Sequence, residues 1–390
     1  MKHFPRPRLA MEMIESCMGK TLFGDTHNGL FLAAPRRTGK TTFLRMDLKP
    51  ALEQQGVHVI YVDLWSDLDG DPGLIIADAI GKALANTNTA FNKIARNTRL
   101  DKVTIPGVSL GFNRPDQPDT ITLTDALRAM IEAAKSPVAL IIDEAQHALT
   151  SERGRNTMVA LKSARDQINA PGLVQLMLIM SGSDRDKLLH LVHGNSSPFF
   201  GSQVGHMPEL DQNFIAFIAQ EIEAVRPDLI PVDVNTLFRA FQLFGNRPQL
   251  IMTAVTDAIS PLASTSERFE CKVMDEALLR QKRDEDEMKN GFLALTPLGQ
   301  AIIWRMLEMG ENFRPYDAAA LDFYAEKTAK KPSIANVQKT IQTLRDQNHP
   351  MIWKSAMGEY SVSDAAMHRW YLKKAENGGW PPTRQGENNA

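Results

Sequence analysis

The stretch Ala34-Pro35-Arg36-Arg37-Thr38-Gly39-Lys40-Thr41 directly follows the apolar run Leu30-Phe31-Leu32-Ala33. A glycine-containing loop between an apolar strand and the start of a helix is the arrangement of a phosphate-binding loop. Successive backbone N–H groups in such a loop, together with the helix N-terminus, form a concave site for an anion. The sequence therefore predicts a phosphate-binding loop in an α/β domain.

The residue types in this loop fit a bound triphosphate with magnesium. Gly39 lets the backbone approach the phosphates, Lys40 supplies a charge for the β- and γ-phosphates, and the Thr41 hydroxyl can bind Mg²⁺. Ala34 stands where many such loops have glycine, so alanine would be strained there if the position needs a positive φ. The predicted nucleotide-binding residues are Ala34, Pro35, Arg36, Arg37, Thr38, Gly39, Lys40, Thr41, Thr42 and Asp143.

A second motif supplies the acidic half of the site. The apolar run from Val138 ends in Asp143-Glu144, and parallel strands bring their carboxyl ends to one edge of a sheet. We expect Asp143 to face the magnesium held by Thr41, through water, and Glu144 to polarise the attacking water as a base. The alternative is that Asp143 only caps the following helix.

Further polar residues are candidates for contacts with the phosphates. Ser183 follows the apolar run that starts at Leu173, and Ser181 is the alternative at this strand end. Arg247, in Gly245-Asn246-Arg247-Pro248, could stabilise phosphate charge in cis, or it is a plain surface arginine. The predicted catalytic residues are Glu144, Lys40, Ser183 and Arg247, whereas His147 is expected to be a polar helix-face histidine.

Composition limits the classes of function. The chain has 390 residues with a net charge of −2, so any nucleic-acid binding must come from a local patch. Its two cysteines give no disulfide framework or metal-spaced pair, which favours a reducing cytoplasm. The longest apolar run, Leu173–Met180, is far too short to span a bilayer, and the N-terminus lacks a signal-peptide core.

Hydrophobic patterning predicts a parallel sheet covered by helices in the first 210 residues. Strands are expected over 30–34, 57–63, 138–143 and 173–181, helices over 41–55, 72–85 and 123–134, and an inserted hairpin or loop over 101–120. After residue 210 the pattern is helical. The predicted domains are a P-loop core (1–210), a helical lid (211–265), a charged helical linker (266–295), a winged helix (296–375) and a disordered tail (376–390).

The motifs PRRTGKT, LIIDEAQ, SGS and GNRP, with the terminal winged-helix pattern, resemble AAA+ ATPases of the origin-recognition and archaeal-type group, which are related to the signal-transducing STAND ATPases. The resemblance covers roughly residues 5–374. It implies a sheet order of 5-1-4-3-2, a helical lid and a winged-helix tail, with ATP and Mg²⁺ as cofactors. It also implies that Phe4-Pro5-Arg6-Pro7 lines the adenine pocket.

The chain also departs from these relatives. They often carry an arginine near the start of the last core strand, where this chain has Phe200-Gly201-Ser202-Gln203. An arginine finger given to a neighbouring subunit is therefore in doubt, with Arg185 as a substitute, and a nucleotide-dependent oligomer stays open.

The winged-helix pattern places its second helix over 333–347, where it could enter a major groove. Polar and basic side chains there, with Lys330 before the helix and Lys354 on the wing, could contact phosphates and base edges. The alternative is that this helix packs on protein. Arg153, Arg155, Lys162 and Arg165 form a second basic cluster, interpreted as a solvated face or a subunit contact. The predicted DNA contacts are Lys331, Asn336, Gln338, Lys339, Gln342 and Arg345.

Three functions fit the sequence. The first is an ATPase switch, slow or stimulated by a partner, that couples nucleotide state to double-stranded DNA binding. The second is a STAND-like signalling ATPase, for instance in phage defence, whose winged helix binds protein. The third is a nucleotide-binding module with little turnover.

Overall fold

In the computed structural model the chain forms two compact units. The first comprises residues 1–36, 40–207 and 355–357, and the second comprises residues 37–39, 208–354 and 358–390. The structure describes residues 3–20, 29–67, 69–86, 102–105, 108–111, 120–193, 197–260, 268–347, 350–354 and 358–383.

The first unit is built on a five-stranded sheet whose strands are all parallel. The strands run in the order β2-β6-β7-β1-β8. If the five strands of this sheet are numbered 1 to 5 along the chain and the order is given from β8 to β2, it becomes 5-1-4-3-2, as the resemblance implies. Every residue of β6 and β7 is buried, as expected of central strands covered on both faces. The bounds are β1 (Leu30–Ala33), β2 (His58–Asp63), β6 (Val138–Asp143), β7 (Leu176–Gly182) and β8 (Val204–His206).

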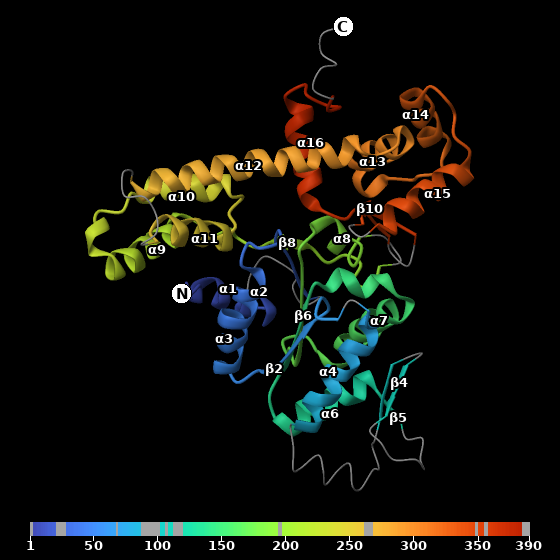
Figure 1. Ribbon diagram of the computed structural model, residues 1–390. Coiled ribbons are helices and arrows are strands. Elements are labelled where there is room, and N and C mark those ends of the chain that lie inside the picture. The colour runs from blue at the N-terminus through green and yellow to red at the C-terminus, as the bar shows by residue number, and fades with distance from the viewer. Residues whose placement is uncertain are drawn as a thin grey trace. The chain divides into compact units, whose positions relative to one another are not determined.

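Helices cover both faces of this sheet. Figure 1 shows α4, α6 and α7 on one side of the strands and α1 and α3 on the other. The helix predicted over 41–55 is present as α2, a π-helical turn and α3, whereas α7 was not predicted. The bounds are α1 (Pro7–Cys17), α2 (Lys40–Phe43), the turn Leu44–Leu48, α3 (Lys49–Gln54), α4 (Pro72–Asn86), α6 (Leu123–Ala134) and α7 (Glu152–Ile168).

Shorter elements complete the first unit. The hairpin predicted within 101–120 is present as antiparallel β3 (Lys102–Ile105) and β4 (Val108–Gly111), and β3 also pairs in parallel with β5 (Thr120–Thr122). The rest of that segment lies outside the described residues. A 3-10 helix, η2 (Ala145–Thr150), follows β6, and α8 (Arg185–Leu189) follows β7.

The second unit begins with four helices. The Asp211 side chain accepts a hydrogen bond from the Asn213 backbone N–H and caps α9. Helices α10 and α11 pack on the long helix α12, which occupies most of the predicted charged linker. The bounds are α9 (Gln212–Val225), α10 (Val234–Leu243), α11 (Pro248–Ala258) and α12 (Phe269–Leu293).

The remainder of the second unit has the outline of a winged helix, with three helices followed by two antiparallel strands. The Ser333 side chain caps α15, and Val337, Ile341 and Leu344 of that helix are buried in a common core. The bounds are α13 (Pro297–Met309), α14 (Ala318–Thr328), α15 (Ile334–Arg345), β9 (Ile352–Lys354), β10 (Tyr360–Val362) and α16 (Ala365–Glu376).

The disordered tail predicted from residue 376 is wrong as far as residue 383. The Trp380 ring centroid lies 4.8 Å from that of Tyr371, 5.0 Å from that of Phe292 and 5.3 Å from that of Trp370. Because aromatic rings bury large apolar surfaces, this cluster holds the segment after α16 against the core. Residues 384–390 lie outside the described residues.

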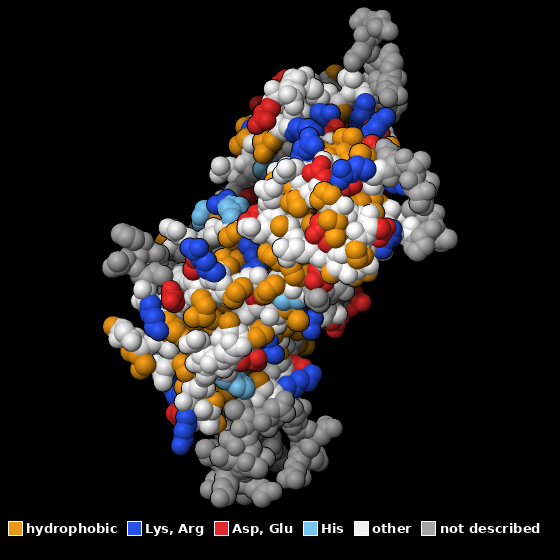
Figure 2. All heavy atoms as spheres, turned by 90° about the vertical axis from the view of Figure 1, so that its left-hand side faces the viewer, with side chains coloured by type: hydrophobic (Ala, Val, Ile, Leu, Met, Phe, Trp, Pro, Cys, Tyr) orange, Lys and Arg blue, Asp and Glu red, His pale blue; other side chains and the backbone are white. Residues whose placement is uncertain are grey.

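Two observations concern the surface. Among the described residues, no helix combines the length and apolar character needed to cross a membrane. On the face shown in Figure 2, Lys and Arg side chains are interspersed with acidic, polar and hydrophobic ones. That distribution agrees with the near-neutral net charge of −2.

Candidate functional site

The loop predicted to bind phosphate joins β1 to α2, at the position expected from the sequence. Its positive φ angles fall on Arg37, at 65°, and Gly39, at 94°. Ala34 is not among the described residues with positive φ, so alanine in place of glycine causes no backbone strain. The Ala34 backbone N–H instead donates to the Gly182 carbonyl at 3.0 Å, which anchors the start of the loop to β7.

Lys40 reaches the acidic end of β6. Its ammonium pairs with Asp143 Oδ1 and lies 2.9 Å from Glu144 Oε1. The Lys40 and Asp143 side chains are only 5% and 1% exposed, so these charges are paired almost out of contact with water. Residues more than 100 positions apart in the sequence therefore meet in one cluster, as the parallel arrangement of strands predicts.

Asp143 also accepts hydrogen bonds from three hydroxyl groups. Thr41 Oγ1 donates to Oδ2 at 2.6 Å, Tyr61 Oη donates to Oδ2 at 3.1 Å, and Ser181 Oγ donates to Oδ1. The carboxylate is fixed in one orientation by partners from the phosphate-binding loop, β2 and β7. These contacts with three other segments argue against the alternative that Asp143 only caps the following helix.

Glu144 has its own set of donors. Ser183 Oγ donates to Glu144 Oε2 at 2.7 Å, the Ser183 backbone N–H at 3.2 Å, and Gln146 Nε2 at 2.5 Å. Glu144 itself has φ 55°, so its side chain leaves the strand in a different direction from that of Asp143. The two neighbouring carboxylates therefore have separate partners and separate orientations.

These contacts decide the charge states of the site. Burial raises the pKa of Asp143 and of Glu144, but the Lys40 charge and the hydrogen bonds outweigh burial, so both pKa values lie below their ordinary range. Burial also raises the pKa of Tyr61, as does the charge of Asp143. Both carboxylates are therefore ionised and Tyr61 keeps its proton at neutral pH.

The remaining predicted residues fall in several places. Ser183 donates a hydrogen bond to Glu144, and Ser181 donates one to Asp143, so each serine binds a different carboxylate. Arg247 lies in the second unit, where its Nη1 is 3.5 Å from Asp284 of α12. Arg185 is exposed at the start of α8.

The segment Phe4–Pro7 lies beside the turn after α2. The Arg6 backbone N–H donates a hydrogen bond to the Asp47 side chain of that turn at 2.9 Å.

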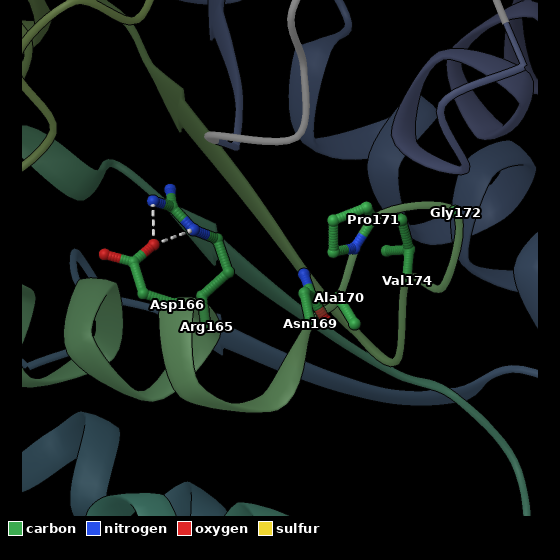
Figure 3. Close-up of a pocket in the computed structure, with 7 residues that line it drawn as sticks. All are labelled: Arg165, Asp166, Asn169, Ala170, Pro171, Gly172 and Val174. Carbon is green, nitrogen blue, oxygen red and sulfur yellow. Dashed lines mark hydrogen bonds and ion pairs between the residues drawn. The ribbon is translucent and has the colours of Figure 1, made fainter.

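A cavity lies at the other end of β7 from the carboxylate cluster. Figure 3 shows this cavity, of about 460 Å³, between the end of α7 and the start of β7, and it is lined by Arg165, Asp166, Asn169, Ala170, Pro171, Gly172 and Val174. Arg165 is only 4% exposed and pairs with Asp166, so the interpretation as a solvated basic face is wrong for Arg165. Lys162 also pairs with Asp166, at 3.1 Å.

Sequence reasoning missed two members of the cluster, Tyr61 and Gln146. The parallel register that pairs Asp63 with Asp143 places Tyr61 two residues before the end of β2, on the same face as Asp63. Gln146 follows Glu144 by two residues in the chain. Both are polar groups at the edge where the acidic motif ends, and that was the signal available in the sequence.

The comparisons with known proteins concern the family and the fold, and they agree with the predicted P-loop class. A family described as the AAA domain matches residues 24–189. The matched residues include the loop from Ala34 to Thr41 and the pair Asp143-Glu144. This match confirms the predicted class of P-loop ATPase, whose members bind ATP with Mg²⁺. No protein of curated function matches the chain.

A solved structure supports the fold of the whole chain. The ORC2 protein of Aeropyrum pernix, in its ADP form, is 13% identical, with 95% of this chain and 93% of that chain covered and a TM-score of 0.52. The Walker-type ATPase PABY2304 of Pyrococcus abyssi is 18% identical over 95% of this chain and 96% of that one, with a TM-score of 0.48. At 13% identity the likeness to the ORC2 protein shows the fold alone, and the roles assigned to individual residues stay predictions.

Proposed function

We propose that this protein is an ATP-hydrolysing switch that couples the state of its AAA domain to a partner bound by its second unit. The observation that carries the proposal is the meeting of Lys40 and Thr41, from the phosphate-binding loop, with Asp143 and Glu144, from the end of β6. A cationic loop facing two ionised carboxylates suits a triphosphate with its metal.

The residues present fit ATP with Mg²⁺. Loop amides and Lys40 would bind the phosphates, and the hydroxyl and carboxylate oxygens of Thr41 and Asp143 are the ligand type that Mg²⁺ prefers. The metal, when bound, would neutralise charge on the phosphates. Tyr61 and Ser181 hold Asp143 in place through hydrogen bonds.

Glu144 is the residue we assign to activation of the attacking water. It is ionised, is the second carboxylate at the strand end, and can accept a proton or orient a water. In the structure its oxygens are occupied by Lys40, Ser183 and Gln146. Hydrolysis therefore requires these donors to rearrange, which agrees with slow turnover that a partner accelerates.

Two variants test this assignment. Glu144→Gln keeps the shape of the side chain, so ATP affinity should stay near the wild-type value while the hydrolysis rate falls by about 100-fold or more. Lys40→Ala should abolish ATP binding. The matched control is Lys49→Ala on α3, where the lysine is partly exposed and pairs with Glu53. Binding would be measured by calorimetry and turnover by phosphate release. Equal slow rates in wild type and Glu144→Gln would favour a binding module without turnover.

We infer double-stranded DNA as the partner of the second unit. The buried residues of α15, Val337, Ile341 and Leu344, face the core. Its exposed residues include Asn336, Gln338, Lys339 and Gln342, the polar kind of side chain that a groove-binding helix presents. Lys330 and Lys331 are exposed before this helix. The proposal draws on the fold shared with the origin-recognition protein of Aeropyrum pernix, although that likeness carries no function by itself.

One observation favours the alternative, a signalling ATPase whose winged helix binds protein. Lys331 pairs with Asp322 at 2.7 Å, and Gln342 donates to both oxygens of Asp346 at 2.8 Å. These carboxylates offset part of the positive charge that DNA phosphates would need. The salt dependence described in the Discussion separates the two partners.

A further inference from the structure

A row of three side chains borders the carboxylate cluster in the first unit. The Arg36 guanidinium carbon lies 4.3 Å from the centre of the Trp65 ring, and the Trp65 ring centroid lies 4.7 Å from that of His147 at 72°. Trp65 is 40% exposed, so its ring is partly accessible to solvent. Its backbone N–H donates to Asp63 at 2.9 Å, so the turn after β2 presents the ring at this edge.

Arg36 connects to Glu144 through one intermediate. Arg36 Nε donates to Ser183 Oγ at 3.4 Å, and Ser183 Oγ donates to Glu144 Oε2 at 2.7 Å. A hydroxyl that accepts a bond from a cation donates more strongly, because neighbouring hydrogen bonds polarise one another. The Arg36 charge therefore strengthens the bond by which Ser183 occupies Glu144.

The Arg36 guanidinium could bind an anion more strongly than it binds its present neighbours. Within the described part of the chain, no carboxylate lies within ion-pair distance of it, and its close contacts are the Trp65 ring and Ser183. A guanidinium presents a planar fork of donors that matches phosphate oxygens. Cation–π attraction at a partly exposed ring is weaker than a charge-assisted bond to phosphate.

Resting on the proposed function, we infer that Arg36 is a cis-acting sensor of the terminal phosphate. When a triphosphate is bound, the guanidinium leaves Trp65 and Ser183 for the γ-phosphate oxygens. Ser183 then loses the cation that strengthens its bond to Glu144, and that carboxylate becomes available to a water. A diphosphate offers no such contact, so Arg36 stays on Trp65.

Tryptophan fluorescence tests this movement directly. Of the five tryptophans, only Trp65 belongs to the first unit, whereas Trp304, Trp353, Trp370 and Trp380 belong to the second. We expect the β,γ-imido analogue of ATP, with Mg²⁺, to change the emission, and ADP to leave it unchanged. Trp65→Phe should bind both nucleotides and lose the response.

Substitution of Arg36 gives the second readout. Arg36→Gln should bind ADP within about twofold of wild type and the triphosphate analogue about tenfold more weakly, with no analogue-specific emission change. Arg36→Lys keeps the positive charge but lacks the planar fork of donors. Its affinity for the triphosphate analogue should therefore lie between those of wild type and Arg36→Gln. Arg305→Gln, which removes the cation over the Phe323 ring at 5.1 Å in the second unit, is the control and should behave as wild type.

The outcomes are distinguishable. Wild-type protein that binds neither nucleotide would end the proposed function itself. Wild-type protein that binds both, with Arg36→Gln weakening them equally or with the same emission change for ADP and analogue, would overturn the sensor role and leave the ATP site intact.

Discussion

At the scale of single residues, the molecule concentrates buried charge in one cluster. Lys40 is paired with Asp143 and Glu144, and each carboxylate has further donors. Removing one partner from a buried pair leaves a charge uncompensated, which costs several kcal/mol. The cluster is therefore sensitive to any substitution of Lys40, so loss of ATP binding in Lys40→Ala must be interpreted together with a measurement of folding, such as circular dichroism.

His147 gives a prediction at the same scale. Burial lowers the pKa of His147 to about 4 from its ordinary 6.5. Because the unfolded chain binds this proton more readily, the stabilisation is full above pH 6.5 and is lost as pH falls toward 4. Between pH 7 and pH 5 the wild type should lose about 2 kcal/mol more stability than His147→Gln.

Urea unfolding of both proteins at the two pH values measures this difference, and the other titrating groups cancel in the comparison. Parallel losses in wild type and variant would show that His147 is not held neutral by its surroundings.

At the scale of elements, the close approach of η2 and α7 depends on Gly154. A Cβ atom at Gly154 would lie 2.1 Å from the Ala148 carbonyl oxygen, which belongs to the backbone and cannot turn aside. The Ser151 side chain accepts a hydrogen bond from the Gly154 N–H, so the same residue is fixed as part of the helix cap. The position of η2 matters because it carries Gln146 and His147.

Gly154→Ala should therefore destabilise the first unit by about 1–3 kcal/mol. Gly291→Ala is the matched control, because Gly291 lies in α12 with nothing within 4 Å of the position that a Cβ atom would take, and alanine there should stabilise the helix by about 0.5–1 kcal/mol. Thermal unfolding with and without ATP measures both. An unchanged midpoint for Gly154→Ala would show that η2 and α7 separate freely.

Much of the element pattern could be predicted from the sequence. The buried strands were found because a parallel sheet needs near-continuous apolar runs, and the predicted bounds of β6 and α6 match the structure. Helix α7 was not predicted because its charged residues were interpreted as a basic cluster. Its buried residues Met158, Leu161 and Ala164 nevertheless recur at helical spacing. Trp380 was missed because packing with residues far along the chain leaves no local pattern.

At the scale of the whole molecule, the net charge of −2 gives no general attraction to nucleic acid. Any DNA affinity would have to come from a local patch, which we propose to be α15 and its surroundings. Near α15, Lys331 is paired with Asp322, and the carboxylate of Asp346 lies beside Gln342. Any affinity for DNA is therefore expected to be modest. The dependence of that affinity on salt concentration would show whether it comes from contacts with DNA phosphates.

Binding to a mixed-sequence DNA duplex should weaken steeply as salt rises, because counterions are released from the phosphates. Lys339→Gln should weaken binding and lower the slope of log affinity against log salt by about one. Lys282→Gln, which removes the same charge from α12, should leave both unchanged. Fluorescence anisotropy with and without ATP measures this. Absent binding, or a Lys339→Gln protein equal to wild type, would favour a protein partner.

The sequence by itself determined the class of this protein. The loop from Ala34 to Thr41 and the pair Asp143-Glu144 are local patterns, and a parallel sheet must bring the ends of its strands to one edge. Strand patterning and chain topology were therefore enough to predict that Lys40, Thr41 and the two carboxylates lie together.

Only the tertiary structure decided how the cluster is arranged. Tyr61 joins Asp143, Ser181 and Ser183 divide the two carboxylates, and Arg36 lies between Trp65 and Ser183. Each of these contacts depends on the direction of a side chain across neighbouring strands or turns. Sequence periodicity gives the face on which a residue lies, but the partner it reaches is decided by packing among segments distant in the chain.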